Sequence, residues 1–408
     1  MFIKKLCAVF LALSLMTAAI STDDAAASVV SPGNWSMGDS FNLVYGTGNS
    51  VKYTYGEIQN LYLNNYYNVQ STEMDIENSN LLYQKYSLEF DKINNDIVNI
   101  KKLLDPNKDV TEYQKQLADL TAQKAEMYSN KENSIITYNN SSVYRNIQRT
   151  AQLSLFRDDI YNMKLLYEKG LVQKRLAEYA RLQGNSKEIN KSKDMAFQSD
   201  IDLHNADYDY YISQQELLTQ QVNTNAENVL SSSAMDTTKA VTISVPVASI
   251  RAIPLKNFSE VEKSFYLNDY KNMQMGEKVR ILDGKISILK EYYKDSSNEI
   301  KLAVNEKKQA ELEARKWLIQ RRALLQNYYS QYKSKYYEVN IKEKKANALY
   351  QKYIILLNKY NYKLATELSL KDAEVNYKIA AQEAWDSLCG YVEALGKIEK
   401  AISGNINP

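Results

Sequence analysis

The sequence predicts an all-α protein made of two tandem repeats of long antiparallel coiled-coil helices, with one short strand in the linker between them. Three observations support this fold class. Glycine and proline are rare, at 12 and 5 residues in a chain of 408, and long proline-free segments are what uninterrupted helices require. Apolar residues recur at alternating steps of three and four, which is the period of a coiled coil. The second half of the chain repeats the order of helices and turns in the first half, which indicates two tandem units.

Residues 1–27 have the pattern of a secretory signal peptide. Two lysines precede an apolar stretch, and the small residues Ala25 and Ala27 stand where a signal peptidase cuts, so cleavage is expected after Ala27. An uncleaved membrane anchor is the alternative, but the apolar stretch is short for a full span of roughly 20 residues. The mature protein is therefore expected to be exported. Residues 28–50 are rich in glycine and serine and are expected to form an extended arm.

The first repeat is predicted to span residues 51–230. Thr54 and Glu57 have the spacing of a capping box, in which each side chain bonds the backbone N–H of the other residue, so a helix is expected to begin there. Thr111 and Gln114 have the same spacing and predict a second helix start. The expected helices cover about 54–104, 111–183 with a weak break at 139–142, and a last segment that ends near 229.

Residues 231–257 are predicted to be a linker, and residues 258–403 the second repeat. The alternating sequence Val241–Val245 predicts a short strand within the linker. Ser259 and Glu262 again have the spacing of a capping pair. The expected helices of this repeat are one that begins at the capping pair, one over about 299–361 after a weak break at 295–298, and one over about 368–402.

Each repeat also contains one tight turn between two long helices. The first is predicted at Gly184-Asn185-Ser186, and the second at Tyr362–Thr366. Both turns precede helices in matching register, so the internal symmetry is expected to place them at the same end of the molecule. The sequence Tyr266–Tyr270 echoes Tyr62–Tyr66 and supports the same two-fold repetition.

The last helix has the clearest coiled-coil register. Apolar and small residues on it alternate steps of three and four, a pattern that keeps one seam against a partner helix and imposes a left-handed supercoil. The seam consists of Leu370, Ala373, Tyr377, Ala381, Ala384, Leu388, Tyr391, Leu395, Ile398 and Ile402. We expect this helix to pack antiparallel against the long helix before it.

No catalytic or metal-binding constellation is found in the sequence. His204 is the only histidine and Cys389 the only cysteine that remains after the predicted cleavage, so neither a histidine metal site nor an internal disulfide can form within one chain. The 51 basic and 49 acidic residues nearly balance, which argues against binding to nucleic acid. The 33 tyrosines are interpreted as seam and amphipathic surface residues. We therefore predict a protein that is not an enzyme and holds no cofactor and no metal.

The segment around the second turn resembles the C-terminal repeat of the TolC-like outer-membrane efflux proteins. The matching residues are Tyr360, Leu364, Ala365, Thr366, Glu367, Leu368, Leu370, Ala373 and Glu374. The resemblance implies that three copies of the chain assemble into a hollow helical barrel. Each copy is then one protomer of that α-barrel. It also implies an adaptor protein and an inner-membrane transporter as partners. The adaptor would dock on the tips of the hairpins, which are Gly184, Asn185, Ser186, Lys363, Leu364, Ala365 and Thr366 here.

The chain departs from the family pattern in two respects. Lys363 stands where the family has a glycine and Ser369 where it has an aspartate. The family also inserts a pair of membrane-spanning strands in each repeat, near 105–142 and 295–298 in this numbering. A spanning strand needs about 9–11 alternating residues, and neither region supplies two of them. The chain is expected to keep the helical tube and to lack these strands.

The leading functional hypothesis is an efflux or secretion duct of the cell envelope that works with an adaptor and a transporter. Such a duct would be associated with the outer membrane if the host has one, and would be extracytoplasmic otherwise. The alternative is an extracytoplasmic coiled-coil scaffold or adhesin without transport activity. Two-fold repetition with matched tips favours the duct, and the missing strands favour the scaffold.

Overall fold

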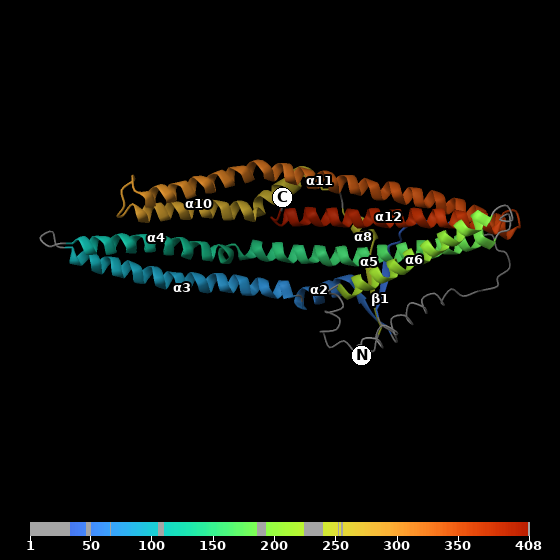
Figure 1. Cartoon of the computed structure of the whole chain (residues 1–408), viewed down its shortest axis with the longest axis horizontal. Coiled ribbons are helices and arrows are strands. Elements are labelled where there is room, and N and C mark those ends of the chain that lie inside the picture. Colours follow the sequence, from blue (N-terminus) through green and yellow to red (C-terminus); the bar gives the residue numbers. More distant parts are fainter. Residues whose placement is uncertain are drawn as a thin grey trace. The chain divides into compact units, whose positions relative to one another are not determined.

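The computed structural model describes residues 33–45, 50–65, 67–104, 110–185, 193–223, 240–251, 253 and 256–406. The predicted signal peptide and residues 224–239 of the predicted helix end and linker therefore lie outside the described residues. The chain divides into two compact units, each of which takes segments from both halves of the sequence (Figure 1). Unit 1 comprises Met1–Tyr66, Leu153–Leu255 and Ser330–Gly396, and unit 2 comprises Tyr67–Gln152, Lys256–Tyr329 and Lys397–Pro408.

Unit 2 is built from two antiparallel helical hairpins. The first consists of α3 (Tyr67–Leu103) and α4 (Thr111–Asn139), and the second of α10 (Tyr270–Leu289) and the first half of α11 (Asn298–Asn361). The short α9 (Phe258–Asn268) precedes α10. The core between the hairpins consists of Ala125, Ile288, Leu289, Ile300 and Ala303.

Polar contacts fix the order of the helices within unit 2 as α3, α4, α10 and α11 (Figure 1). The Ser79 hydroxyl on α3 donates to the carbonyl oxygen of Ser134 on α4. Arg280 on α10 binds Glu132 on α4 at 3.0 Å, and Lys278 on α10 binds Glu313 on α11 at 3.4 Å. Successive helices run in opposite directions, because each hairpin turns back on itself and α4 and α10 point opposite ways.

Unit 1 contains a three-stranded sheet in the order β1, β3, β2. Strand β1 (Ser40–Tyr45) pairs antiparallel with β3 (Ala240–Pro246), and β2 (Ser50–Thr54) pairs parallel with β3. Strand β3 confirms the strand predicted in the linker. Strands β1 and β2 were not expected, since the sequence analysis treated residues 28–50 as an extended arm and began a helix near Thr54. Strand β2 leads into α2 (Tyr55–Asn65) and β3 into α8 (Ala248–Arg251), so the parallel pair joins the start of the first repeat to the linker.

The long helices of unit 1 are the later part of α5 (Ser141–Asn185), α6 (Lys193–Asn223), the second half of α11 and most of α12 (Glu367–Ile402). The predicted antiparallel pairing of the last two helices is confirmed. The rings of Tyr353 and Tyr377 stack with centroids 6.0 Å apart, and those of Tyr332 and Tyr391 with centroids 5.6 Å apart. Eight of the ten predicted seam residues of α12 are buried, and Ala373 and Ile402 are half-buried.

The segment that follows the predicted signal peptide packs along α11 and α12. The Trp35 backbone N–H donates to Oδ1 of Asn347 at 3.0 Å, and the Trp35 ring packs against the alanine cluster Ala346, Ala380 and Ala384. Farther along, Phe41 lies edge-on to the rings of Tyr161 and Trp385, each with centroids 5.6 Å away. Side chains of the sheet thereby join α5 to α12.

The helix starts agree only partly with the predicted capping pairs. Thr54 and Glu57 form the expected box, with the Thr54 N–H donating to Glu57 at 2.7 Å and the Glu57 N–H to Thr54 at 3.3 Å. The pair at Thr111 is wrong, because Val110 is the N-cap of α4 and makes no side-chain capping bond. The pair at Ser259 is also wrong, since the Asn257 side chain accepts from the Ser259 N–H and caps α9 two residues earlier. Asparagine is itself among the best N-cap residues.

The regions where the resemblance implies spanning strands are helix and turn. Helices α4 and α5 cover 111–139 and 141–185, and residues 290–297 form the turn between α10 and α11. Residues 105–109 lie outside the described part. No helix of the described residues combines the length and apolar character needed to cross a bilayer.

Candidate partner-docking tip

The turn between α11 and α12 is closed by a Schellman motif. Lys363 has a φ of 60°, in the left-handed region. Its N–H donates to the carbonyl of Tyr360 at 2.8 Å, and the Leu364 N–H donates to that of Lys359 at 2.7 Å. These two bonds satisfy carbonyl groups that the end of a helix leaves without partners. The left-handed position is the one at which the resemblance to the TolC-like family implies a glycine, and glycine adopts this conformation at the least cost.

Replacing Lys363 with glycine is expected to stabilise the protein by about 0.5–1 kcal/mol, because a residue with a Cβ pays for the left-handed conformation and glycine does not. A rise in the melting temperature would be the measured result. Ala365→Gly is the matched control within the same turn. Lys363 is the only described non-glycine residue with positive φ, so the control should lower the melting temperature or leave it unchanged. A lower melting temperature for Lys363→Gly would contradict the assignment.

Thr366 begins α12 as its N-cap. Its hydroxyl accepts from the Ser369 N–H at 3.2 Å, while the Ser369 hydroxyl donates to the Thr366 carbonyl at 2.8 Å. Thr366 therefore has a structural role, and so does Ser369, at the position where the resemblance implies an aspartate. Ala365 lies half-buried between the Schellman motif and this cap.

Three large apolar side chains project into solvent at this turn. Tyr360, Tyr362 and Leu364 are 38%, 55% and 77% exposed. In a Schellman motif, the residue after the left-handed one often packs its side chain against the last turn of the helix. The high exposure of Leu364 shows that this contact buries little of it. Neither the motif nor the cap thus accounts for an apolar residue at this position.

The first predicted tip differs from its expected form. Gly184 and Asn185 are the last residues of α5 and are helical, so the tight turn does not begin at Gly184. Ser186 lies outside the described residues. The reason for the error is that glycine permits a turn without requiring one.

Contacts farther down the helices place the end of α5 beside the second tip. Arg175 on α5 binds Glu374 on α12 at 3.0 Å, and Glu178 on α5 binds Lys371 on α12 at 3.3 Å. Since α5 runs toward the tip and α12 away from it, Gly184 and Asn185 lie near the level of the second turn. The structure therefore brings the described parts of both predicted tips together at one end of unit 1.

The same four residues form a charge network that ties α5 to α12. Arg175 also binds Glu178 at 2.7 Å, and Lys371 also binds Glu374 at 2.9 Å. Burial alone would raise the pKa of Glu178, but Arg175 and Lys371 outweigh burial and lower it below the ordinary value of 4.5. Folding thus favours the ionised form of this carboxylate.

The network should make the protein less stable in acid. A carboxylate with a depressed pKa contributes its full stability above the unfolded-state value, near 4.5, and loses it as the pH falls through the lower folded-state value. The melting temperature should therefore fall as the pH drops below about 4.5. Glu178→Gln should melt lower than the unmodified protein at pH 7, and the difference should shrink toward pH 3. A difference that stays constant with pH would exclude this role for Glu178.

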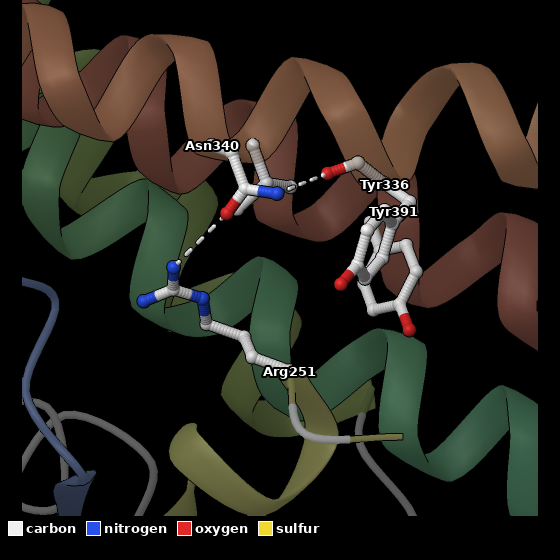
Figure 2. A pocket seen from close by; sticks show the side chains of 5 residues that line it. Arg251, Tyr336, Asn340 and Tyr391 are labelled. Carbon is white, nitrogen blue, oxygen red and sulfur yellow. Dashed lines mark hydrogen bonds between the residues drawn. The ribbon is translucent and has the colours of Figure 1, made fainter. Parts of the chain in front are cut away.

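Unit 1 also contains a small cavity between α8, α11 and α12, shown in Figure 2. It measures about 50 Å³ and is lined by Arg251, Tyr336, Val339, Asn340 and Tyr391. Arg251 binds Glu343 at 2.8 Å and Oδ1 of Asn340 at 3.5 Å. Ligand pockets are usually about 300–1,000 Å³. The cavity has room for a few water molecules, and its arginine serves to anchor α8 on α11.

Cys389 and His204, whose side chains could in principle be reactive, both form hydrogen bonds with backbone carbonyl groups. Cys389 donates to the carbonyl of Tyr161 at 3.4 Å, and burial raises the pKa of its thiol to about 12. Such a thiol is a poor nucleophile, because the thiolate is the reactive form. His204 is exposed and bonds the carbonyl of Asp200 at 2.7 Å. Within the described ranges, no group of His, Cys, Asp and Glu residues could hold a metal ion.

Comparison with known proteins gives structural likeness without sequence similarity. Neither a family sequence model nor a curated protein sequence matches the chain. The fold, however, matches the open state of the MtrE outer membrane channel of Neisseria gonorrhoeae, with a TM-score of 0.52 and 12% identity over 85% of this chain and 88% of that one. The chain has the fold of a TolC-like outer-membrane channel.

A second solved structure agrees with the TolC-like fold. A membrane protein from Pseudomonas aeruginosa matches with a TM-score of 0.51 and 10% identity, over 85% of this chain and 93% of that one. The predicted all-α fold class with a short strand is thereby confirmed, as is the resemblance at the level of the fold. At these identities the likeness extends to the backbone and not to the role of any single residue.

Proposed function

We propose that this protein is the protomer of a TolC-like export duct in the cell envelope. In this proposal several copies, three by analogy with the family, close a helical tube through which a membrane transporter delivers small molecules or proteins. An adaptor docks on the tip formed by Lys363, Leu364, Ala365 and Thr366 together with the end of α5. The observation that carries the proposal is the fold, which matches an open outer-membrane channel along most of both chains.

Exposed apolar stripes on the edge helices of unit 1 support an assembly of several copies. On α6, Phe197, Tyr208 and Tyr211 are 67%, 63% and 55% exposed. On the second half of α11, Ile341 and Ile355 are 66% and 53% exposed. Large apolar side chains repeated along an exposed helix face usually mark an interface. They are expected at the edges of an incomplete tube wall.

The competing candidate is an extracytoplasmic scaffold or adhesin. The observation in its favour is that the described residues in the regions of the implied spanning strands are helix and turn. A scaffold would still use coiled-coil surfaces, but it would need neither a central opening nor a transporter.

Light scattering and electron microscopy of the purified mature chain test the proposal. A duct protomer should form a closed oligomer of defined size at micromolar concentration, with a central opening in end-on views. A stable monomer would refute the duct. A rod-like oligomer without an opening would refute it too and would favour the scaffold.

A further inference from the structure

The turn between α11 and α12 carries positive charge beside its exposed apolar side chains. Lys359, in the last turn of α11, and Lys363, at the left-handed position, are both exposed. Arg181 is exposed on the neighbouring end of α5. Within the described part of the chain, none of these three side chains forms an ion pair. Glu367 is the only acidic residue of the segment 359–370, so basic residues outnumber acidic ones at this end of unit 1.

The charge and the apolar surface lie next to each other in the turn. Lys363 stands between Tyr362 and Leu364, which are 55% and 77% exposed. A partner that covers Leu364 therefore comes within reach of the Lys363 ammonium group, which sits on a long and adaptable stem. Protein interfaces commonly have this composition, with an apolar centre and a polar rim.

The backbone at Lys363 would be satisfied better by another residue. Its φ of 60° costs a residue with a Cβ more than it costs glycine, and the Schellman motif uses only the N–H groups of Lys363 and Leu364. The helix dipole favours Lys359 in the last turn of α11 and Glu367 in the first turn of α12. It gives no reason for a lysine at the left-handed position itself. Local backbone strain of this kind is a reason to look for a function of the side chain.

We propose that the tip docks an acidic protein segment, in which a carboxylate that binds Lys363 lies beside an apolar side chain that covers Leu364. This inference rests on the proposed function for the presence of a partner at the tip. It adds the chemistry of that partner and makes Lys363 a binding residue. An acidic segment is favoured over a basic one because like charges placed opposite each other weaken an interface and so select against the wrong partner.

The proposal gives Lys363→Gly two opposite effects. The substitution removes the cost of the left-handed conformation and should raise the melting temperature, as argued above. It also removes the ammonium group and should weaken binding of the acidic segment. A lysine with only a structural role would not give a variant that is more stable and yet binds less well.

Two synthetic helical-hairpin peptides serve as probes of the protein. The turn of one reads Asp-Leu-Asp, the turn of the other reads Lys-Leu-Lys, and the two peptides are otherwise identical. Fluorescence anisotropy of the labelled peptides should show tighter binding of the acidic one, and added salt should weaken that binding because exposed charges are screened. Equal binding of the two, tighter binding of the basic peptide, or no binding of either would overturn the inference.

Single substitutions test the role of Lys363. Lys363→Gln keeps a long side chain at the left-handed position but loses the charge. It should weaken binding of the acidic peptide by roughly two- to fivefold, as the loss of an exposed ion pair does. Lys363→Arg keeps the charge and should lose less. Lys333→Gln is the matched control, since Lys333 is exposed on the same helix but lies roughly 40 Å from its end. An equal loss in Lys333→Gln would show that Lys363 has no specific role.

The state of assembly separates failure of this inference from failure of the proposed function. A closed oligomer with a central opening that does not prefer the acidic peptide would retain the duct and overturn the inference. A monomer that prefers the acidic peptide would refute the duct and still support an acidic partner at the tip.

Discussion

Asp269→Ala is expected to lower the free energy of unfolding by about 3–5 kcal/mol, the usual cost of removing one partner from a buried ion pair. Asp269 is 1% exposed and lies at the junction of α9 and α10. Its carboxylate accepts from the Asn272 N–H at 3.0 Å and so caps α10. It also accepts from the Trp317 indole at 3.1 Å and from Arg321 at 2.8 Å. Alanine would remove the cap and would leave a half-buried guanidinium and a buried indole N–H without their acceptor.

Two further variants separate these contributions. Asp269→Asn keeps a capping oxygen and an acceptor for Trp317 but loses the charge, so its cost should be smaller than that of alanine. Asp283→Ala removes a carboxylate from the surface of the same helix. Its side chain is 56% exposed and pairs with Lys307, and an exposed pair contributes only about 0–1 kcal/mol. Urea unfolding followed by tryptophan fluorescence gives the three values. Equal losses for Asp269→Ala and Asp283→Ala would show that the buried pair does not stabilise unit 2.

Local sequence patterns predicted the long helices well, because their signals lie within each helix. The α12 seam could be predicted because its apolar residues recur at alternating steps of three and four. The turn before α12 could be predicted because that pattern stops there. Strand β2 was missed, although Val51 and Tyr53 alternate with polar residues. It spans only five residues and exists by pairing with β3, which lies far along the chain. No local signal reveals such a partner.

Long-range polar contacts were likewise beyond the reach of sequence reasoning. Asp269 belonged to a motif that was read only as an echo of Tyr62–Tyr66, whereas its partner Arg321 lies 52 residues later. The second tip could be placed, since Lys363 stands where a glycine was expected and the turn chemistry is local. Gly184 was misplaced for the opposite reason, because a glycine near a helix end does not by itself determine whether the helix stops there.

If the tip docks an adaptor as we propose, Leu364→Asp is expected to abolish that binding without reducing the stability of the protein. Leu364 is 77% exposed and its N–H is the only group of this residue that the Schellman motif uses, so an aspartate leaves the backbone bonds of the turn in place. A charge in the centre of an apolar contact, by contrast, must be desolvated without a partner. Pull-down of the proposed adaptor by the protein should therefore fail, while the melting temperature stays unchanged.

Thr366→Ala is the control for that experiment, two residues away from Leu364 and opposite in its expected effect. It removes the acceptor for the Ser369 N–H and should cost about 1 kcal/mol, as the loss of an N-cap does. Because Thr366 serves the proposed tip as the N-cap of α12 and Leu364 supplies the proposed apolar contact, binding should persist at temperatures where the variant is folded. Leu364→Asp is thus expected to change binding alone, and Thr366→Ala to change stability alone. If Leu364→Asp binds the adaptor normally at unchanged stability, the exposed leucine is not a docking residue, and the tip built on Lys363–Thr366 has only the structural role of joining α11 to α12.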